Sequence, residues 1–133
     1  MSGKKILIID DDQHLLQGLT ARLKANDYSV ICASDAISAI TVARREAPDL
    51  VILDLGLPAG DGFVVLERMR NLVGLVTIPV IVLSAADPAG NKKRALDAGA
   101  VAFFQKPPNN HEFLTAIRQA LGESVALSTF LKT

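Results

Sequence analysis

The sequence predicts an α/β fold in which a parallel sheet is covered by helices on both faces. Apolar runs and amphipathic runs alternate along residues 5–121 with short connections between them. This alternation is typical of a parallel sheet with right-handed crossovers. Residues 6–9 and 50–53 are continuously apolar, which indicates strands buried on both faces.

Each apolar run is expected to form one strand, at residues 5–9, 29–33, 50–54, 79–84 and 102–105. The first helix is expected over roughly 13–26, because four leucines recur there at helical spacing. These residues are Leu15, Leu16, Leu19 and Leu23.

The second and third helices are expected to begin at polar residues that can cap a first turn. Ser34 can cap the second helix, which Pro48 ends, and Asp61 can cap the third. Their inner faces are expected to carry Ile37, Ile40 and Ala43 in the second helix, and Val65, Leu66, Met69 and Leu72 in the third.

The last two helices also have start signals. Asp87 followed by Pro88 is typical of an N-cap with proline at the first helical position. Asn109, with Glu112 three residues later, resembles a capping box. The inner face of this last helix is expected to carry Phe113, Leu114, Ile117 and Leu121.

We expect one domain over residues 1–122 and a tail or linker stub over 123–133. In the tail, Leu127, Phe130 and Leu131 have helix-like spacing, so a short docked helix is an alternative to a linker.

The composition limits the classes of function. Half of the 133 residues are hydrophobic, which favours a globular domain over disorder. Fourteen basic residues balance fourteen acidic ones, so no net charge attracts nucleic acid or an anionic membrane.

We find neither a signal-peptide pattern nor an apolar stretch near the roughly 20 residues that span a bilayer. One cysteine, Cys32, allows no internal disulfide. These features favour a cytoplasmic protein, with Cys32 expected as a buried, inert thiol.

Acidic residues follow two of the expected strands. Asp10 and Asp11 follow the first strand, and Asp54 ends the third. In a parallel sheet the ligand crevice lies beyond the carboxyl ends of the strands, so these carboxylates should lie together. Two carboxylates about 4 Å apart repel each other by roughly 4 kcal/mol at an effective dielectric near 20. A proton, a metal ion or a lysine must relieve that repulsion, and Lys106, after the fifth strand, is the expected lysine.

The same residues could perform phosphoryl chemistry. Mg²⁺ prefers oxygen ligands, commonly one or two carboxylates with several waters, so Asp11 and Asp54 are expected as direct ligands and Asp10 as the holder of a coordinated water. A carboxylate beside a metal ion and a lysine is also a competent nucleophile toward phosphorus, because the cations reduce the repulsion of phosphate. Asp54 would then become an aspartyl phosphate, contacted by Lys106 and the Ser84 hydroxyl.

Several motifs occur in one order between residue 4 and about residue 122. They are Ile-Leu-Ile-Ile-Asp-Asp-Asp at 6–12, Pro-Asp-Leu-Val-Ile-Leu-Asp-Leu-Gly-Leu-Pro at 48–58, Asp-Gly at 61–62, Pro-Val-Ile-Val-Leu-Ser-Ala at 79–85, Gly-Ala at 99–100 and Lys-Pro at 106–107. Together they resemble the receiver domain of response regulators in bacterial two-component systems.

The resemblance implies a flavodoxin-like (βα)5 fold, doubly wound, with strand order 2-1-3-4-5. It implies a signalling switch and not an enzyme, apart from the chemistry of its own phosphorylation and dephosphorylation. Asp54 would accept the phosphoryl group from a histidine kinase or a phosphotransfer protein. The face formed by the fourth helix, the fifth strand and the fifth helix would then change. Output would come from a partner or a domain outside this chain, without nucleic-acid or membrane binding by this domain, and phosphorylation could promote a homodimer.

The resemblance also implies roles for the site residues. Lys106 and Ser84 would contact the phosphoryl group, and the peptide bond between Lys106 and Pro107 would be cis. The ligands that organise Mg²⁺, or Mn²⁺, would be Asp10, Asp11, Asp54 and the backbone carbonyl of Gly56.

Two positions depart from the common receiver pattern. The residue three before the lysine is often a tyrosine that rotates inward as the hydroxyl residue moves. Here it is Phe103, so the predicted switch pair is Ser84 and Phe103, without a phenolic hydroxyl. Gly56 and Ala86 lie two residues beyond Asp54 and Ser84, and neither side chain can orient an attacking water. We therefore expect slow loss of the phosphoryl group.

Three other functions fit the sequence less well. A phosphatase of the haloacid dehalogenase type would need a second acid two residues after its nucleophile, where Gly56 lies. A flavin or nucleotide carrier would need glycines and hydroxyls after the first strand, where three aspartates would repel phosphate. A receiver that works without phosphorylation would be expected to lack an aspartate or the lysine.

Overall fold

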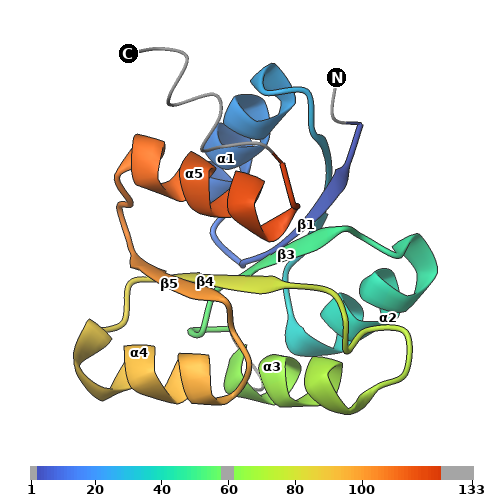
Figure 1. Ribbon diagram of the computed structural model, residues 1–133, viewed down its shortest axis with the longest axis vertical. Coiled ribbons are helices and arrows are strands. Elements are labelled where there is room, and N and C mark those ends of the chain that lie inside the picture. Colours follow the sequence, from blue (N-terminus) through green and yellow to red (C-terminus); the bar gives the residue numbers. More distant parts are fainter. Residues whose placement is uncertain (1–2, 58–61, 124–133) are drawn as a thin grey trace.

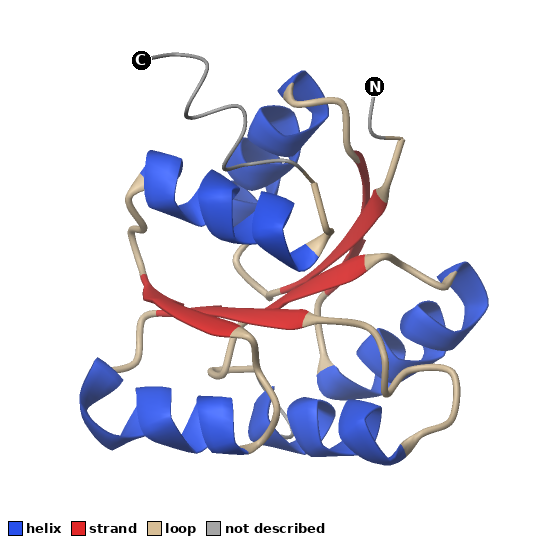
Figure 2. Cartoon of the chain, in the orientation of Figure 1, coloured by secondary structure: helices blue, strands red, loops and turns tan. Residues whose placement is uncertain are grey.

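Parallel strands alternate with helices in the computed structural model, which describes residues 3–57 and 62–123 (Figure 1 and Figure 2). The strands form one five-stranded sheet in the order β2-β1-β3-β4-β5, which confirms the predicted α/β fold and strand order. Within residues 3–57 and 62–123, each helix is too short or too polar to span a lipid bilayer. The strands are β1 (Lys5–Ile9), β2 (Ser29–Ala33), β3 (Leu50–Leu53), β4 (Val80–Ser84) and β5 (Ala102–Gln105), and the helices are α1 (Gln13–Ala25), α2 (Ala36–Glu46), α3 (Gly62–Asn71), α4 (Pro88–Asp97) and α5 (Asn110–Ala120).

The sheet lies between two layers of helices. Helices α1 and α5 cover one face, and α2, α3 and α4 cover the other (Figure 1). Successive side chains of a strand point to opposite faces. Accordingly Ile6 and Ile8 join the apolar cluster under α1 and α5, whereas Leu7 and Ile9 join the cluster under α2, α3 and α4. Each of the four is at most 1% exposed, as expected for a central strand of a parallel sheet.

Two of the predicted helix caps are confirmed. The Asp87 carboxylate accepts a hydrogen bond of 2.9 Å from the backbone N–H of Ala89, and Pro88 lies at the start of α4. The Asn109 side chain accepts one of 3.0 Å from the N–H of Glu112. The predicted cap at Asp61 lies outside the described residues.

The predicted cap at Ser34 is wrong by one residue. The N-cap of α2 is Asp35, whose carboxylate accepts a hydrogen bond of 2.8 Å from the backbone N–H of Ser38. The same carboxylate accepts a second bond, of 2.9 Å, from the Ser38 hydroxyl. A carboxylate near the positive end of the helix dipole is the more favourable cap here.

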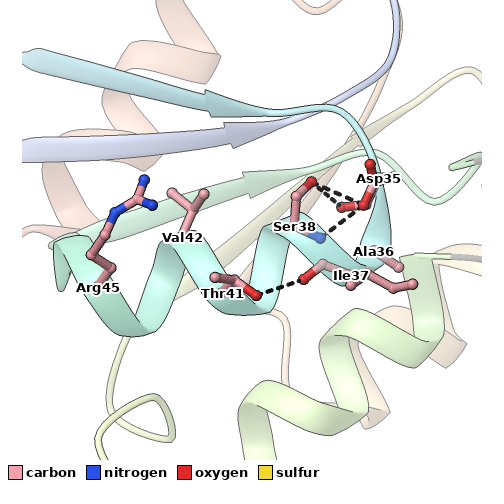
Figure 3. Close-up of a pocket in the computed structure, with 7 residues that line it drawn as sticks. All are labelled: Asp35, Ala36, Ile37, Ser38, Thr41, Val42 and Arg45. Atoms are coloured by element: carbon pink, nitrogen blue, oxygen red, sulfur yellow. Dashed lines mark hydrogen bonds between the residues drawn. The ribbon is translucent and has the colours of Figure 1, made fainter.

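Ile37 is not on the inner face of α2, contrary to the prediction. Its side chain is 76% exposed and points away from the strands in Figure 3. Helix α2 packs at the β2 edge of the sheet and against α3, so its buried stripe is narrow and holds Ala39, Ile40 and Ala43. A hollow of about 610 Å³ lies along the outer part of this helix (Figure 3). Of the other predicted inner-face residues, Leu15, Leu72 and Leu114 are half-buried and the rest are buried.

Cys32 is exposed, so the prediction of a buried thiol is wrong. It lies on β2, which is an edge strand and pairs only with β1 in the described sheet. Its Sγ atom is 3.9 Å from the Thr20 hydroxyl. The apolar neighbours of Cys32 in the sequence do not distinguish an edge strand from a central one.

Helix α4 is held less firmly by packing than the other helices. Its only buried residue is Ala95, and one methyl group contributes only about 0.8 kcal/mol of hydrophobic stabilisation. The first turn is also irregular, because Ala89 and Gly90 have non-helical dihedral angles and Gly90 has a φ of 77°. By contrast α1 buries Leu16, Leu19 and Leu23.

The residues that follow α5 are tied to Tyr28, in the turn between α1 and β2, and to Lys4, which precedes β1. The Tyr28 hydroxyl donates a hydrogen bond of 2.6 Å to the Glu123 carboxylate, and the Lys4 ammonium donates one of 2.9 Å to the carbonyl of Leu121. Burial and the hydrogen bond to Glu123 raise the pKa of Tyr28 to about 12.

The raised pKa of Tyr28 predicts a loss of stability at alkaline pH. Between pH 10 and 12 an unfolded tyrosine loses its proton while the folded protein keeps it, so the free energy of unfolding falls as the pH rises. The expected loss between pH 9 and 11.5 is about 1 to 2 kcal/mol greater than in Tyr28→Phe. Because the chain has one tyrosine and no tryptophan, tyrosinate absorbance measures the titration directly. A midpoint near pH 10 in the folded protein would contradict this prediction.

Candidate functional site

The carboxyl ends of the strands bring the predicted site residues to one edge of the sheet. The parallel hydrogen-bond pattern continues one residue beyond β1, β3 and β5. The N–H of Asp54 donates to the carbonyl of Ile9 at 2.9 Å, and the N–H of Lys106 donates to the carbonyl of Ser84 at 2.9 Å. These backbone hydrogen bonds therefore fix the Cα positions of Asp54 and Lys106 independently of any side-chain contact.

Three carboxylates gather at this edge. Asp10, Asp11 and Asp54 each offer a carboxylate oxygen, and these oxygens lie within 4.8 Å of one another. Asp10 is 2% exposed and Asp54 is 7% exposed, whereas Asp11 faces solvent. The N–H of Asp10 donates to the carbonyl of Ala33 at 3.0 Å, so β2 also helps to position the site.

Lys106 is the cation that faces these carboxylates, as the sequence predicted. Its ammonium lies 2.8 Å from Oδ2 of Asp10 and 3.6 Å from Oδ2 of Asp54. The Lys106 side chain is 17% exposed, whereas that of Asp10 is only 3% exposed. The Lys106 side chain therefore extends from the end of β5 past β4 and reaches the carboxylates that follow β1 and β3. It forms the wall of the site on the β5 side.

The electrostatics of the pair follow from this difference in burial. Burial raises the pKa of Asp10, and the nearby charge of Asp54 adds to this, against the lowering effects of Lys106 and the backbone N–H of Asp12. For Lys106, burial alone would lower the pKa, but the hydrogen bond and charge of Asp10, together with Asp54, outweigh burial and raise it. Lys106 thus stays protonated. Its single positive charge does not balance three carboxylates, so a further cation would be favourable at the site.

Two glycines shape the backbone around Asp54. The N–H of Gly56 donates to Oδ1 of Asp54 at 3.1 Å, and a Cβ atom added to Gly56 would lie 3.7 Å from both carboxylate oxygens. Gly62 lies against the other side, where an added Cβ would be 2.4 Å from the carbonyl oxygen of Asp54 and 2.6 Å from Cα of Leu55. Position 56 therefore controls access to the carboxylate, and position 62 controls how closely α3 approaches it.

Ser84 and Phe103 lie on the same face of the sheet. Ser84 is 1% exposed, and its hydroxyl accepts a hydrogen bond of 3.2 Å from the N–H of Ala86. Phe103 pairs with Val82, two residues before Ser84, and both Phe103 and Val82 belong to the cluster under α2, α3 and α4. The Phe103 ring is 9% exposed, so it occupies an inward position in this structure.

The donor set fits a hard divalent cation. Mg²⁺ takes oxygen ligands in octahedral geometry and usually keeps several waters. Two nearly buried carboxylates beside an exposed one supply such oxygens and leave a solvent-facing side for water. The peptide bond between Lys106 and Pro107 is cis, in agreement with the prediction.

The family of the chain is shown by comparison with known proteins. The model of the response regulator receiver domain matches residues 6–118. The chain belongs to this receiver family. The receiver domain is 43% identical over 121 residues to the transcriptional regulatory protein KdpE of Mycobacterium tuberculosis, covering 91% of this chain and 52% of that protein. It therefore spans about half the length of this curated relative.

Solved structures agree with the fold of this receiver domain. A putative response regulator from Chloroflexus aurantiacus superposes with a TM-score of 0.85 at 28% identity, over 90% of this chain and 98% of the other. The receiver domain of the sensor histidine kinase PA1611 from Pseudomonas aeruginosa superposes with a TM-score of 0.83 at 26% identity, over 91% and 99%. That structure has a magnesium ion coordinated in its active-site cleft.

Two features of this receiver domain near the site were not predicted from the sequence. The first is the close packing of Gly62 against the backbone of Asp54. The second is Arg94, whose guanidinium covers the ring of Phe63, the residue after Gly62. The pair Asp61-Gly62 in the motif set was a signal for the first feature, and we see no sequence signal for the second.

Proposed function

We propose that this receiver domain is a signalling switch in which Asp54 accepts a phosphoryl group from a histidine kinase or a phosphotransfer protein. The observation that carries the proposal is the grouping of Asp54 with two other carboxylates, 3.6 Å from the ammonium of Lys106, at the open edge of the sheet. The chemistry of the donor set and the match to the receiver family both support it.

The proposed step is a transfer between two nucleophiles. A carboxylate oxygen of Asp54 attacks phosphorus, the new O–P bond forms, and the P–N bond to the donor histidine breaks. The imidazole leaves with the bonding electron pair and takes a proton from solvent. Lys106 contacts a phosphoryl oxygen and offsets its charge, as preorganised cations do in phosphoryl transfer. The backbone N–H of Gly56, already directed at Oδ1 of Asp54, helps to orient the attacking carboxylate.

Asp10, Asp11 and Asp54, with the backbone carbonyl of Gly56, would hold Mg²⁺ or Mn²⁺. The ion would supply positive charge that draws the phosphoryl donor toward three carboxylates and stabilises the charge that develops during transfer. With a glycine at 56 and an alanine at 86, no long polar side chain can direct water at the phosphoryl group. Slow loss of phosphate therefore remains part of the proposal.

The response to phosphorylation is proposed to pass from Ser84 and Phe103 to the α4–β5–α5 face. A groove of about 540 Å³ lies on this face, beside Leu96 and Val101, which are 39% and 54% exposed. The exposed apolar side chains beside this groove can contribute to binding of a partner or a second copy of the domain. We propose that output comes from a partner or a domain outside residues 1–122, with residues 123–133 as the tail or linker. We further propose that the domain is cytoplasmic. It would bind neither nucleic acid nor membrane directly, and it would have no enzymatic activity on other molecules.

The test is phosphorylation by a small donor. The protein is incubated with Mg²⁺ and acetyl phosphate and weighed by intact mass spectrometry, with Asp54→Asn beside it. We expect one added phosphoryl group in the wild type and none in the variant, because the amide is a poor nucleophile. Decay of the adduct after donor removal tests the expected slow loss.

A matched control is Asp12→Asn. Asp12 caps α1 through its side chain and is not part of the carboxylate group that could hold a metal, so this variant should gain the adduct like the wild type. An adduct on Asp54→Asn, or none on the wild type with the donor and with a histidine kinase, would overturn the proposal.

A further inference from the structure

Helix α4 is joined to α3 by two interactions of arginine side chains. The guanidinium carbon of Arg94 lies 3.6 Å from the centroid of the Phe63 ring. In the opposite direction, Arg70 of α3 donates a hydrogen bond of 2.8 Å to the carbonyl of Asp97. Both contacts are made by the second half of α4. The first turn of α4 is separated from that half by Ala89 and Gly90, whose dihedral angles are non-helical.

The space between these two helices is not closely packed. A groove of about 440 Å³ lies between them, with Phe63 and Arg94 in its lining. Since Ala95 is the only buried residue of α4, there is little apolar interlocking to fix the helix against α3. The arginine contacts are therefore a large share of what joins α4 to its neighbour.

Phe63 is connected to the backbone of the proposed phosphorylation site. It follows Gly62, whose N–H donates to the carbonyl of Leu55 at 2.9 Å. Gly62 also lies so close to the carbonyl of Asp54 that a Cβ atom would not fit. Phe63 itself is 7% exposed and belongs to the apolar core. A continuous series of contacts thus runs from Asp54 through Gly62 to the ring under Arg94.

We propose that Arg94 is a positioning residue that couples α4 to the segment carrying Asp54, through its contact with Phe63. The proposal rests on the proposed function and adds a route from the phosphorylation site to α4 that does not pass through Ser84 or Phe103. Such a route matters here because Phe103 has no hydroxyl with which to hold an inward state. A cation is attracted to an aromatic face over a range of positions above the ring. Helix α4 can therefore shift at the irregular turn around Gly90 while the contact between Arg94 and Phe63 is kept.

The test measures hydrogen exchange of the α4 amides at residues 91–98, with and without Mg²⁺ and beryllofluoride as a phosphoryl mimic. We expect Arg94→Gln to speed exchange of these amides by about two- to fivefold in the free protein, the range expected for one cation–π contact. Beryllofluoride should slow exchange less in this variant than in the wild type, by about the same factor. Because coupling between two sites is reciprocal, the affinity for beryllofluoride should fall by that factor as well.

Matched variants separate coupling from a general loss of structure. Lys92→Gln removes one exposed positive charge from the same helix and should leave exchange and affinity unchanged. Arg94→Lys keeps a cation and should restore part of the coupling. Phe63→Leu removes the ring and should reduce the response to beryllofluoride at least as much as Arg94→Gln, because Phe63 also belongs to the apolar core. The double variant should lose no more of that response than Phe63→Leu alone.

The proposal is overturned if Arg94→Gln responds to beryllofluoride like the wild type, or if Lys92→Gln shows the same loss. If the wild type itself does not bind beryllofluoride, the proposed function fails, and coupling to a phosphoryl group fails with it. Exchange in the free protein still decides whether Arg94 anchors α4, since that measurement needs no ligand at Asp54.

Discussion

Replacing Gly62 with alanine is expected to lower the free energy of unfolding by about 3 kcal/mol and to distort the segment that carries Asp54. The added methyl carbon would lie 2.4 Å from the carbonyl oxygen of Asp54 and 2.6 Å from Cα of Leu55, whereas non-bonded carbon atoms are comfortable at about 3.5 to 4 Å. Both neighbours are backbone atoms, so no side chain can rotate to make room. Either α3 moves away or the turn after β3 deforms.

The matched control for this substitution is Gly18→Ala. Gly18 lies within α1, is exposed, and would place its Cβ with nothing within 4 Å. Alanine there should stabilise the protein by about 0.5 to 1 kcal/mol, because it lowers the entropy cost of forming the helix. Urea unfolding of both variants measures the difference. Equal stability of the two variants would show that the close approach of α3 to Asp54 is wrong.

Replacing Lys106 with methionine is expected to destabilise the domain by about 2 kcal/mol at neutral pH. The substitution keeps the length of the side chain but removes the ammonium 2.8 Å from Asp10. Asp10 is then a nearly buried carboxylate beside the negative charge of Asp54. Lys92→Met, on the exposed side of α4, is the control for introducing methionine and should change stability little.

The sign of the pH dependence provides a second check on this variant. The pKa of Asp10 is already raised in the folded protein, and it should rise further without Lys106. An acid with a raised folded pKa binds a proton more readily in the folded state, so its cost to stability disappears as the pH falls through that pKa. The stability gap between wild type and Lys106→Met should therefore narrow as the pH falls from neutral into the acid range. Asp35 and Glu46, whose pKa values are lowered, lose stabilisation equally in both proteins and do not affect the gap. A gap that widens toward low pH would contradict the assigned role of burial at Asp10.

The fold and the gathering of the carboxylates could be predicted because they depend on local chemistry and on one topological rule. Apolar runs identify β1 and β3, and parallel strands place Asp10 and Asp54 at the same edge. Caps at Asp87 and Asn109 are local for the same reason, since side chain and N–H lie two or three residues apart. The boundaries of strands and of α1 were predicted to within one residue, which is the precision that helix and strand ends allow.

The features that could not be predicted depend on position in the assembled sheet. Ile37 has the helical spacing of a core residue, but α2 lies at the β2 edge and leaves that side chain without a partner layer. Cys32 is exposed because β2 is an edge strand. The contact of Arg94 with Phe63 joins residues far apart in the chain, and neither residue type predicts such a contact. Each of these needs the tertiary arrangement before it can be stated.

The exposed edge strand also makes the protein convenient to observe. Cys32 is the one cysteine of the chain and is open to solvent, so a thiol-reactive fluorophore or spin label can be attached without mutagenesis. The next residue, Ala33, accepts the backbone hydrogen bond of Asp10. A probe at Cys32 therefore lies one residue from the peptide group that positions the first carboxylate of the site, on the side of the sheet opposite the β5 edge. It would follow binding of cations or phosphoryl donors in real time, while leaving the α4–β5–α5 face free for partners.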